Sequence, residues 1–227
     1  MKRVLVTSGS TRTMIDQVRC LSNVFNGRTG YEIANYIYSE DVSVILLTSN
    51  KVHCDYITNT IPPHYIQAVR YQTYEELYEK MEDLICKTDL DAVIHSAAVS
   101  DYRVAGTYAQ IDGDLVEIDS STKIGSDHDN LFLKLEQTEK IIDKIRDPWG
   151  FKGKLVKFKL QVGMSDEELI EVANKSRKHS NADMIVANCL EWCSERAYII
   201  SEDCTMNVLR KDLPMVLAEE LYGKKEN

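Results

Sequence analysis

Two glycine-containing loops near the start of the chain have the composition of phosphate-binding segments. Residues 8–12 read Ser-Gly-Ser-Thr-Arg after a short apolar run, and residues 26–30 read Asn-Gly-Arg-Thr-Gly before a helical pattern. The backbone N–H groups of such loops, and those at a helix N-terminus, can bind an anion. One such loop alone more often only accommodates a tight turn. Two of them within one connection favour a phosphate-binding site.

The connection that holds both loops is itself unusual. A link of about 20 residues between a strand and the next helix is rare in compact domains and is more often functional than not. It contains neither the Walker motif GxxxxGK[ST] nor the GxGxxG motif of dinucleotide-binding folds. The second strand ends in Thr48, Ser49 and Asn50, where NAD binding would call for an acidic residue. The sequence therefore argues against a Walker-type NTPase and leaves an NAD(P)-dependent reductase as the alternative interpretation.

Other side chains with chemical potential are dispersed along the chain. The six cysteines form no C-x-x-C pair, so we expect reduced thiols rather than a redox site or a zinc ribbon. Cys189, Cys193 and Cys204 are close in sequence, but no nearby histidine completes a set of four metal ligands. His95 ends an apolar run and is predicted to be a hydrogen-bonded core residue rather than a general base. Lys123 lies among polar residues and, taken alone, is a surface charge.

Hydrophobic periodicity predicts strands that alternate with helices. Strands are expected at residues 2–7, 42–47, 92–95, 154–160 and 183–187, and helices at residues 30–39, 74–86 and 138–146. Another helix should begin after Ser165, with Glu168 completing a capping box. This order predicts a Rossmann-like α/β fold of three layers, with a parallel sheet whose carboxyl edge binds ligands. An antiparallel pair at residues 197–201 and 206–209 should precede a last helix.

Residues 103–134 interrupt the alternation. Residues 115–119 and 131–135 read as extended segments around Gly113 and a polar stretch, which predicts a hairpin-like antiparallel excursion from the sheet. The chain shows no internal repeat and no low-complexity linker. We therefore expect a single domain over residues 1–227 that carries this excursion.

The overall composition limits the possible partners. Among 227 residues, 36 are acidic and 27 basic, which gives a net charge of −9 and argues against nonspecific nucleic-acid binding. No apolar stretch approaches the roughly 20 residues of a membrane span, and the start of the chain lacks a signal-peptide core. A cytoplasmic protein that contacts neither nucleic acid nor membrane is expected.

An ordered set of motifs gives the sequence a family resemblance. In chain order these are VLVTSGSTRTMIDQVRCLSNVFNGRTG, HSAAVSDY, the Lys123-Ile124 step, FLKLEQTEKII, FKL and ADMIVAN. The set covers nearly the whole chain and resembles the phosphopantothenoylcysteine synthetase family of coenzyme A biosynthesis. No flavin-binding decarboxylase domain precedes Met1, so a stand-alone synthetase of the bacterial type is expected.

The resemblance implies a ligase that joins 4′-phosphopantothenate to cysteine. The carboxylate of phosphopantothenate would attack the α-phosphate of a nucleoside triphosphate, releasing pyrophosphate and leaving an acyl-nucleotide. The amine of cysteine would then displace the nucleoside monophosphate. Both steps develop or move negative charge, so cations, backbone amides and Mg²⁺ would have to neutralise it.

The resemblance also implies roles for individual residues. Lys123 would hold the triphosphate in the first step, and Asn23 would act on the acyl-nucleotide in the second. The remaining candidates follow from the same match: Gly9, Ala97, Ala98, Asp101 and Phe158 for the nucleotide, Asp101 also for the metal, and Gly27 and Arg28 together with Asn23 for phosphopantothenate.

The sequence departs from the family pattern in two places. Phe25 and Asn26 replace two small hydroxyl residues, which removes hydroxyl contacts to phosphate and leaves the backbone at Gly27 as the cradle. Phe158-Lys159-Leu160-Gln161 stands where many bacterial members read G-F-A-x-E-T. We expect CTP as the nucleotide, with ATP as the alternative, because the short bacterial type fits best.

The resemblance further implies a symmetric homodimer formed through the excursion. Two other functions remain open from the sequence: the NAD(P)-dependent reductase, and a nucleotide-binding protein without catalysis, which the residues at positions 25 and 26 leave possible.

Overall fold

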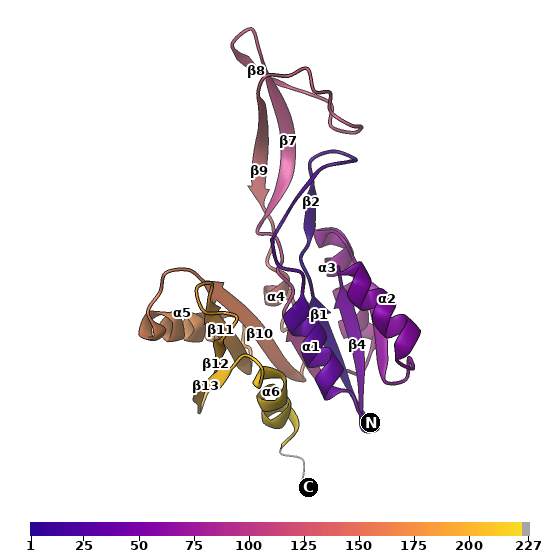
Figure 1. Cartoon of the computed structure of the whole chain (residues 1–227), viewed down its shortest axis with the longest axis vertical. Coiled ribbons are helices and arrows are strands. Elements are labelled where there is room, and N and C mark those ends of the chain that lie inside the picture. Colours follow the sequence, from indigo (N-terminus) through magenta and orange to yellow (C-terminus); the bar gives the residue numbers. More distant parts are fainter. Residues whose placement is uncertain (224–227) are drawn as a thin grey trace.

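The computed structural model describes residues 1–223 and contains one large mixed sheet (Figure 1). Its eight strands follow the order β13-β12-β11-β10-β6-β1-β4-β5. Six strands are mutually parallel: β1 (Lys2–Ser8), β4 (Val42–Thr48), β5 (Ile66–Arg70), β6 (Ala92–His95), β10 (Lys154–Gln161) and β11 (Met184–Cys189). Two antiparallel strands complete it: β12 (Arg196–Ile200) and β13 (Thr205–Leu209).

Helices cover both faces of this sheet. One face packs against α1 (Arg28–Ile37), α2 (Lys51–Thr60) and α6 (Leu213–Tyr222). The other face packs against α3 (Tyr74–Lys87), α4 (Ile141–Lys144) and α5 (Asp166–His179). The inner parallel strands β1, β4 and β6 are buried on both sides over most of their length, which explains why they are near-continuous apolar runs in the sequence. The predicted three-layer Rossmann-like fold is confirmed.

The sheet has a topological switch point between β1 and β6. From β1 the chain passes through α1 to β4 on one side, whereas β6 and β10 extend the sheet on the other side. The loops after β1 and β6 meet at the carboxyl edge, where Ser10 and Ala98 form a parallel bridge, and this is the edge at which open α/β sheets bind ligands. The two glycine loops lie at this edge.

Several elements were not predicted from the sequence. Helix α2 was missed because it buries only Ile57 and so has a weak apolar pattern, and β5 because it is a short, partly exposed edge strand. The long first connection forms a small hairpin of β2 (Arg12–Met14) and β3 (Cys20–Ser22). The helix predicted at residues 138–146 is reduced to α4, because Thr138 is held extended by hydrogen bonds to the 100–101 loop. The capping box at Ser165 is confirmed.

The excursion is a separate three-stranded antiparallel sheet. Strand β7 (Tyr102–Ile111) is its centre and pairs with both β8 (Asp114–Glu117) and β9 (Leu131–Gln137). The two predicted extended segments thus do not pair with each other, as a hairpin would require, because the longer β7 lies between them. Figure 1 shows this sheet, called the arm below, projecting away from the main sheet.

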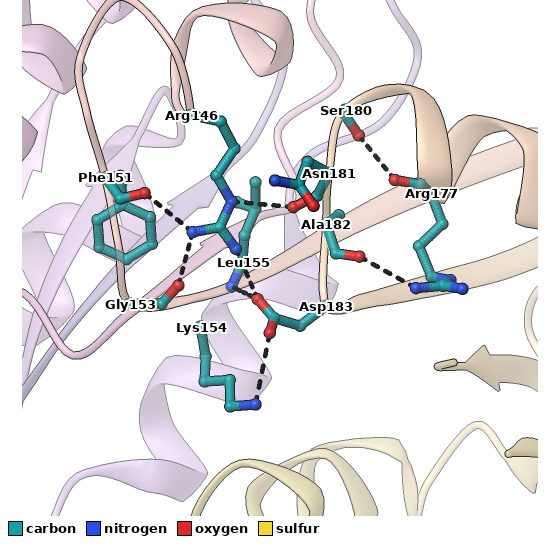
Figure 2. A network of polar contacts seen from close by, with 10 residues as sticks. All are labelled: Arg146, Phe151, Gly153, Lys154, Leu155, Arg177, Ser180, Asn181, Ala182 and Asp183. Carbon is teal, nitrogen blue, oxygen red and sulfur yellow. Dashed lines mark hydrogen bonds and ion pairs between the residues drawn. The ribbon is translucent and has the colours of Figure 1, made fainter. Parts of the chain in front are cut away.

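A polar clamp fixes the opposite, amino edge of the main sheet (Figure 2). The guanidinium of Arg146 donates to the carbonyl oxygens of Phe151 (3.0 Å), Gly153 (2.9 Å) and Asn181 (2.9 Å). It also pairs with the carboxylate of Asp183 at 2.6 Å. These contacts tie the segments that lead into β10 and β11, so we assign this cluster a structural role away from the site.

Candidate functional site

The two glycine loops pack directly against each other. Gly9 and Gly27 have φ values of +89° and +80°, which side chains rarely adopt. A Cβ on Gly27 would lie 2.1 Å from the backbone nitrogen of Gly9, so no larger residue fits there. The hydroxyl of Ser8 donates to the carbonyl of Gly27 at 2.7 Å. The cradle is therefore a composite of both loops, at the N-terminus of α1.

Asn23 and the loop after β6 adjoin this cradle. The side-chain amide of Asn23 donates to the carbonyl of Ala98 at 3.1 Å. The N–H of Ala98 in turn donates to the carbonyl of Gly9 at 2.8 Å. Three predicted site residues from distant parts of the chain are thus joined by hydrogen bonds.

Arg28 faces away from this group. Its guanidinium pairs with Glu32 on the next turn of α1 at 2.6 Å and is largely exposed. Together with Arg210 and Lys211 it lines a cavity of about 610 Å³ on the outer side of α1. The structure therefore does not bring the Arg28 side chain to Asn23, although the backbone at this position begins the helix.

A second cavity, of about 520 Å³, opens beside the loop after β6. Its wall includes the predicted residues Ala97, Asp101 and Phe158. The rest comes from the end of β6, the segment around α4, β10 and α5. Among these are charged or titratable side chains that were not predicted as site residues: His95, Glu139, Lys140, Asp143, Lys157, Lys159 and His179.

The charges of this cavity depend on burial. His95 is buried, lies 2.9 Å from the hydroxyl of Thr7 through its Nδ1 atom, and has a pKa lowered to about 4, chiefly by burial and further by Lys157. It is therefore neutral at pH 7, as expected of a core histidine, although it also lines the cavity. Asp143 and His179 lie 3.4 Å apart at the rim.

Phe158 and Lys157 occupy opposite faces of β10, because side chains alternate along a strand. Phe158 packs with the core cluster on the face of α1 and α6, and borders the cavity as well. Lys157 points to the other face, under α5, where its ammonium bonds Ser180 and the carbonyl of Ser176. The signal available in the sequence was a lysine between the apolar residues Val156 and Phe158 of a parallel strand.

Lys123 is exposed on the loop between β8 and β9 and is not part of the wall of either cavity. The next residue, Ile124, is anchored: its N–H donates to Asp16 at 3.2 Å, and its carbonyl accepts from Arg19 at 2.9 Å. Hydrogen bonds from Arg19 hold the pKa of Asp16 far below its usual range. The long first connection thus fixes the backbone that carries Lys123.

Fold and site together define a Rossmann-like α/β protein with two packed glycine loops and a cavity beside the loop after β6, at its switch point. More particularly, the chain belongs to the family described as the DNA/pantothenate metabolism flavoprotein C-terminal domain, whose model matches residues 1–221. The coenzyme A biosynthesis bifunctional protein of Thermococcus kodakarensis is 34% identical over 192 residues. This confirms the resemblance found in the sequence.

Solved structures agree with this family. The DNA/pantothenate metabolism flavoprotein from Streptococcus pneumoniae superposes with a TM-score of 0.79 at 25% identity, covering 97% of this chain and 98% of that one. A mutant of the protein Cab2, solved with phosphopantothenate-cysteine, gives a TM-score of 0.73 at 16% identity over 96% and 86% of the two chains, which shows the shared fold.

The similarity covers only part of the curated relative. The match spans 84% of this chain and 42% of the Thermococcus protein. Within residues 1–223, no helix is long and apolar enough to cross a bilayer. In the same part of the chain, no three His, Cys, Asp or Glu side chains are grouped as metal ligands, and all six cysteines are free thiols.

Proposed function

We propose that this protein is a phosphopantothenate–cysteine ligase that works through an acyl-nucleotide. The observation that carries the proposal is the junction of Gly9, Gly27, Asn23 and Ala98 at the switch point, in a chain whose family membership is shown. Phosphopantothenate and cysteine would be the substrates, and a nucleoside triphosphate the activating co-substrate.

The geometry suits the two half-reactions, which are formation of the acyl-nucleotide and its attack by cysteine, at neighbouring places in the site. The composite cradle lies at the N-terminus of α1, where the N–H of Arg28 donates to the side chain of Asn26 at 3.2 Å. A phosphate bound there would take the place of this side-chain acceptor. The amide of Asn23 can donate and accept hydrogen bonds, so it suits a neutral acyl group beside a phosphate. Asn23 bonds to Ala98, and the neighbours of Ala98 on the same loop, Ala97 and Val99, line the 520 Å³ cavity that would hold the nucleotide.

A metal would enter with the nucleotide. Asp101 is an exposed carboxylate on the cavity wall, and the described residues offer no cluster of three ligands. This fits Mg²⁺, which commonly keeps several waters and binds one or two carboxylates together with substrate phosphates. When bound, Mg²⁺ would neutralise charge on the phosphates. We propose CTP as the preferred nucleotide, with ATP as the alternative.

The arm supports the proposal of a homodimer. Large apolar side chains on its strands are exposed to solvent: Ile111, Leu115, Val116, Leu131, Phe132 and Leu135. Such a patch is unusual on a monomer and is typical of an interface between copies. Lys123, which is exposed on the same arm, would reach a triphosphate in the assembled enzyme.

A turnover assay tests the function. The purified chain should release pyrophosphate only when nucleotide, Mg²⁺ and phosphopantothenate are all present, and cysteine should then release the nucleoside monophosphate. CTP and ATP are compared in parallel. Pyrophosphate release without phosphopantothenate, or no release with any nucleoside triphosphate, would contradict the ligase. Nucleotide binding without turnover would indicate a binding protein.

A further inference from the structure

Lys157 is a buried cation in the wall of the 520 Å³ cavity. Only 7% of the residue is exposed. Its Nζ atom donates to the hydroxyl of Ser180 at 2.9 Å and to the carbonyl of Ser176 at 3.1 Å. An ammonium has three N–H groups, so these two contacts within the described residues leave one for another acceptor.

The charge of Lys157 is poorly compensated. Within residues 1–223 it forms no ion pair, and the nearby Asp143 pairs with His179 instead. Burial lowers the pKa of Lys157 to about 8; Asp143 opposes this shift, while Lys159 and Lys140 add to it. A buried cation that lacks a carboxylate partner is costly, and an electron-rich ligand in the cavity would relieve that cost.

The surroundings of Lys157 combine charges of both signs from several elements. The groups are His95 from β6, Asp101 from the following loop, Glu139, Lys140 and Asp143 from the segment around α4, Lys159 from β10 and His179 from α5. The acidic groups lie on the loop and around α4, whereas β10 contributes only lysines. The side of the cavity formed by β10 is therefore positive.

We propose that Lys157 binds the nucleotide, donating its remaining N–H to an acceptor atom of the base or of a phosphate. The inference rests on the proposed function only for the identity of the ligand. A purely structural role is the competing explanation, because Ser176 lies in the last turn of α5 and a lysine there also caps free carbonyls.

The test compares Lys157→Met with Lys154→Met. Lys154 lies at the other end of the same strand, is exposed, and contacts Asp183 at the structural clamp. Dissociation constants for Mg·CTP and Mg·ATP are measured by calorimetry at pH 7, and melting temperatures are recorded for all variants. Lys157→Met should weaken nucleotide binding about tenfold or more, since a hydrogen bond from a charged donor is lost. Lys154→Met should bind as the parent does.

Further measurements separate ligand binding from helix capping. In Lys157→Met the KM for nucleotide should rise, whereas the KM values for phosphopantothenate and cysteine should not. Lys157→Arg, which keeps the charge, should restore part of the affinity. A lower melting temperature with unchanged dissociation constants, or an equal rise in all three KM values, would overturn the proposal.

A pH series on the parent protein keeps the inference testable even if Lys157→Met fails to fold. Nucleotide affinity should fall as the pH rises from 7 to 9.5, because the lysine becomes neutral, and Lys157→Arg should flatten this fall. An identical decline in both proteins would contradict it. Binding of inorganic triphosphate and of cytidine then shows which part of the nucleotide Lys157 contacts. Loss of triphosphate binding in Lys157→Met would assign the contact to a phosphate, and loss of cytidine binding would assign it to the base.

The two proposals fail separately. Nucleotide binding that depends on Lys157, without pyrophosphate release, would refute the ligase and keep this inference. Normal ligase activity with unchanged nucleotide affinity in Lys157→Met would refute the inference and keep the ligase.

Discussion

At the scale of single residues, the site depends on groups whose small size matters as much as their chemistry. Gly27 approaches the backbone of Gly9 and the hydroxyl of Ser8 so closely that any Cβ would collide. Phe25 and Asn26, which precede this glycine, are exposed, and the side chain of Asn26 accepts from the N–H of Arg28 at the start of α1 at 3.2 Å. The departure from the family pattern at position 26 therefore places an amide acceptor at the N-terminus of α1.

Lys123→Ala should abolish the first half-reaction while the protein still folds. The side chain is exposed, and its backbone is held through Ile124 rather than through the lysine itself. Removing one cation aimed at the developing charge should lower pyrophosphate release by roughly 10²-fold or more. Lys87→Ala, an exposed lysine on α3 that pairs with Asp83, is the control. Pyrophosphate release at the parent rate would show that Lys123 is only a surface charge.

Asn23→Asp should slow the second half-reaction more than the first. The carboxylate has a similar size but cannot donate to the carbonyl of Ala98, and it repels a neighbouring phosphate. The phosphopantothenoyl-nucleotide should therefore accumulate and be detected by mass spectrometry of the quenched reaction. If product forms normally and no intermediate is found, Asn23 has no part in the mechanism; loss of both half-reactions would assign it to the first step.

At the scale of elements, the connection between β1 and α1 has two tasks. Its ends form the glycine cradle, and its middle, through Asp16 and Arg19, holds the loop of the arm that carries Lys123. A short βα turn could not reach both places. The unusual length of this connection is thus explained by its two sets of contacts, one at the glycine cradle and one at the loop that carries Lys123.

The arm gives a prediction about assembly. Leu131→Asp combined with Leu135→Asp should convert a dimer into a monomer, because these exposed side chains share one face of β9 and two charges would be buried at the interface. Light scattering after gel filtration measures the mass, and circular dichroism checks the fold. Val52→Asp, at an exposed position on α2, should leave the mass unchanged. A parent protein that is monomeric, or a double variant that stays dimeric, would contradict the proposed interface.

At the scale of the whole molecule, the net charge is −9, whereas the substrates that we propose for the site are anions. The N-terminus of α1 and the lysines of β10, Lys157 and Lys159, are the local groups that would favour an anion at the proposed site. Burial also keeps His95 neutral, so that its ring adds no charge near Lys157 at pH 7.

This buried histidine should make the stability depend on pH. The pKa of His95 is about 4 in the folded protein and 6.5 in the unfolded chain. At pH values between these two, the unfolded chain therefore binds a proton at His95 and the folded protein does not. Lowering the pH from 7 to 5 should therefore reduce the free energy of unfolding by about 2 kcal/mol through this group. Urea denaturation at both pH values measures it. His95→Gln should show a correspondingly smaller decrease, and equal decreases in the two proteins would contradict the assignment.

The sequence by itself determined the alternation of apolar runs and helical patterns, and so the three-layer fold. Strands such as β6 and the capping box before α5 were predictable because burial and backbone capping impose local patterns that neighbouring residues display. The predicted site residues came from motif resemblance, and their roles stay predictions. Elements with weak burial, such as α2 and β5, gave no comparable pattern.

Only the tertiary structure decided which residues meet. Asn23, Ala98 and Gly9 are joined by hydrogen bonds across 75 and more residues of chain, and no local pattern encodes such a contact. Lys157 gained its environment in the same way, because the end of α5 closes over it from a distant segment. Proximity between segments far apart in sequence depends on how the sheet orders its strands, which is a property of the folded chain rather than of any stretch within it.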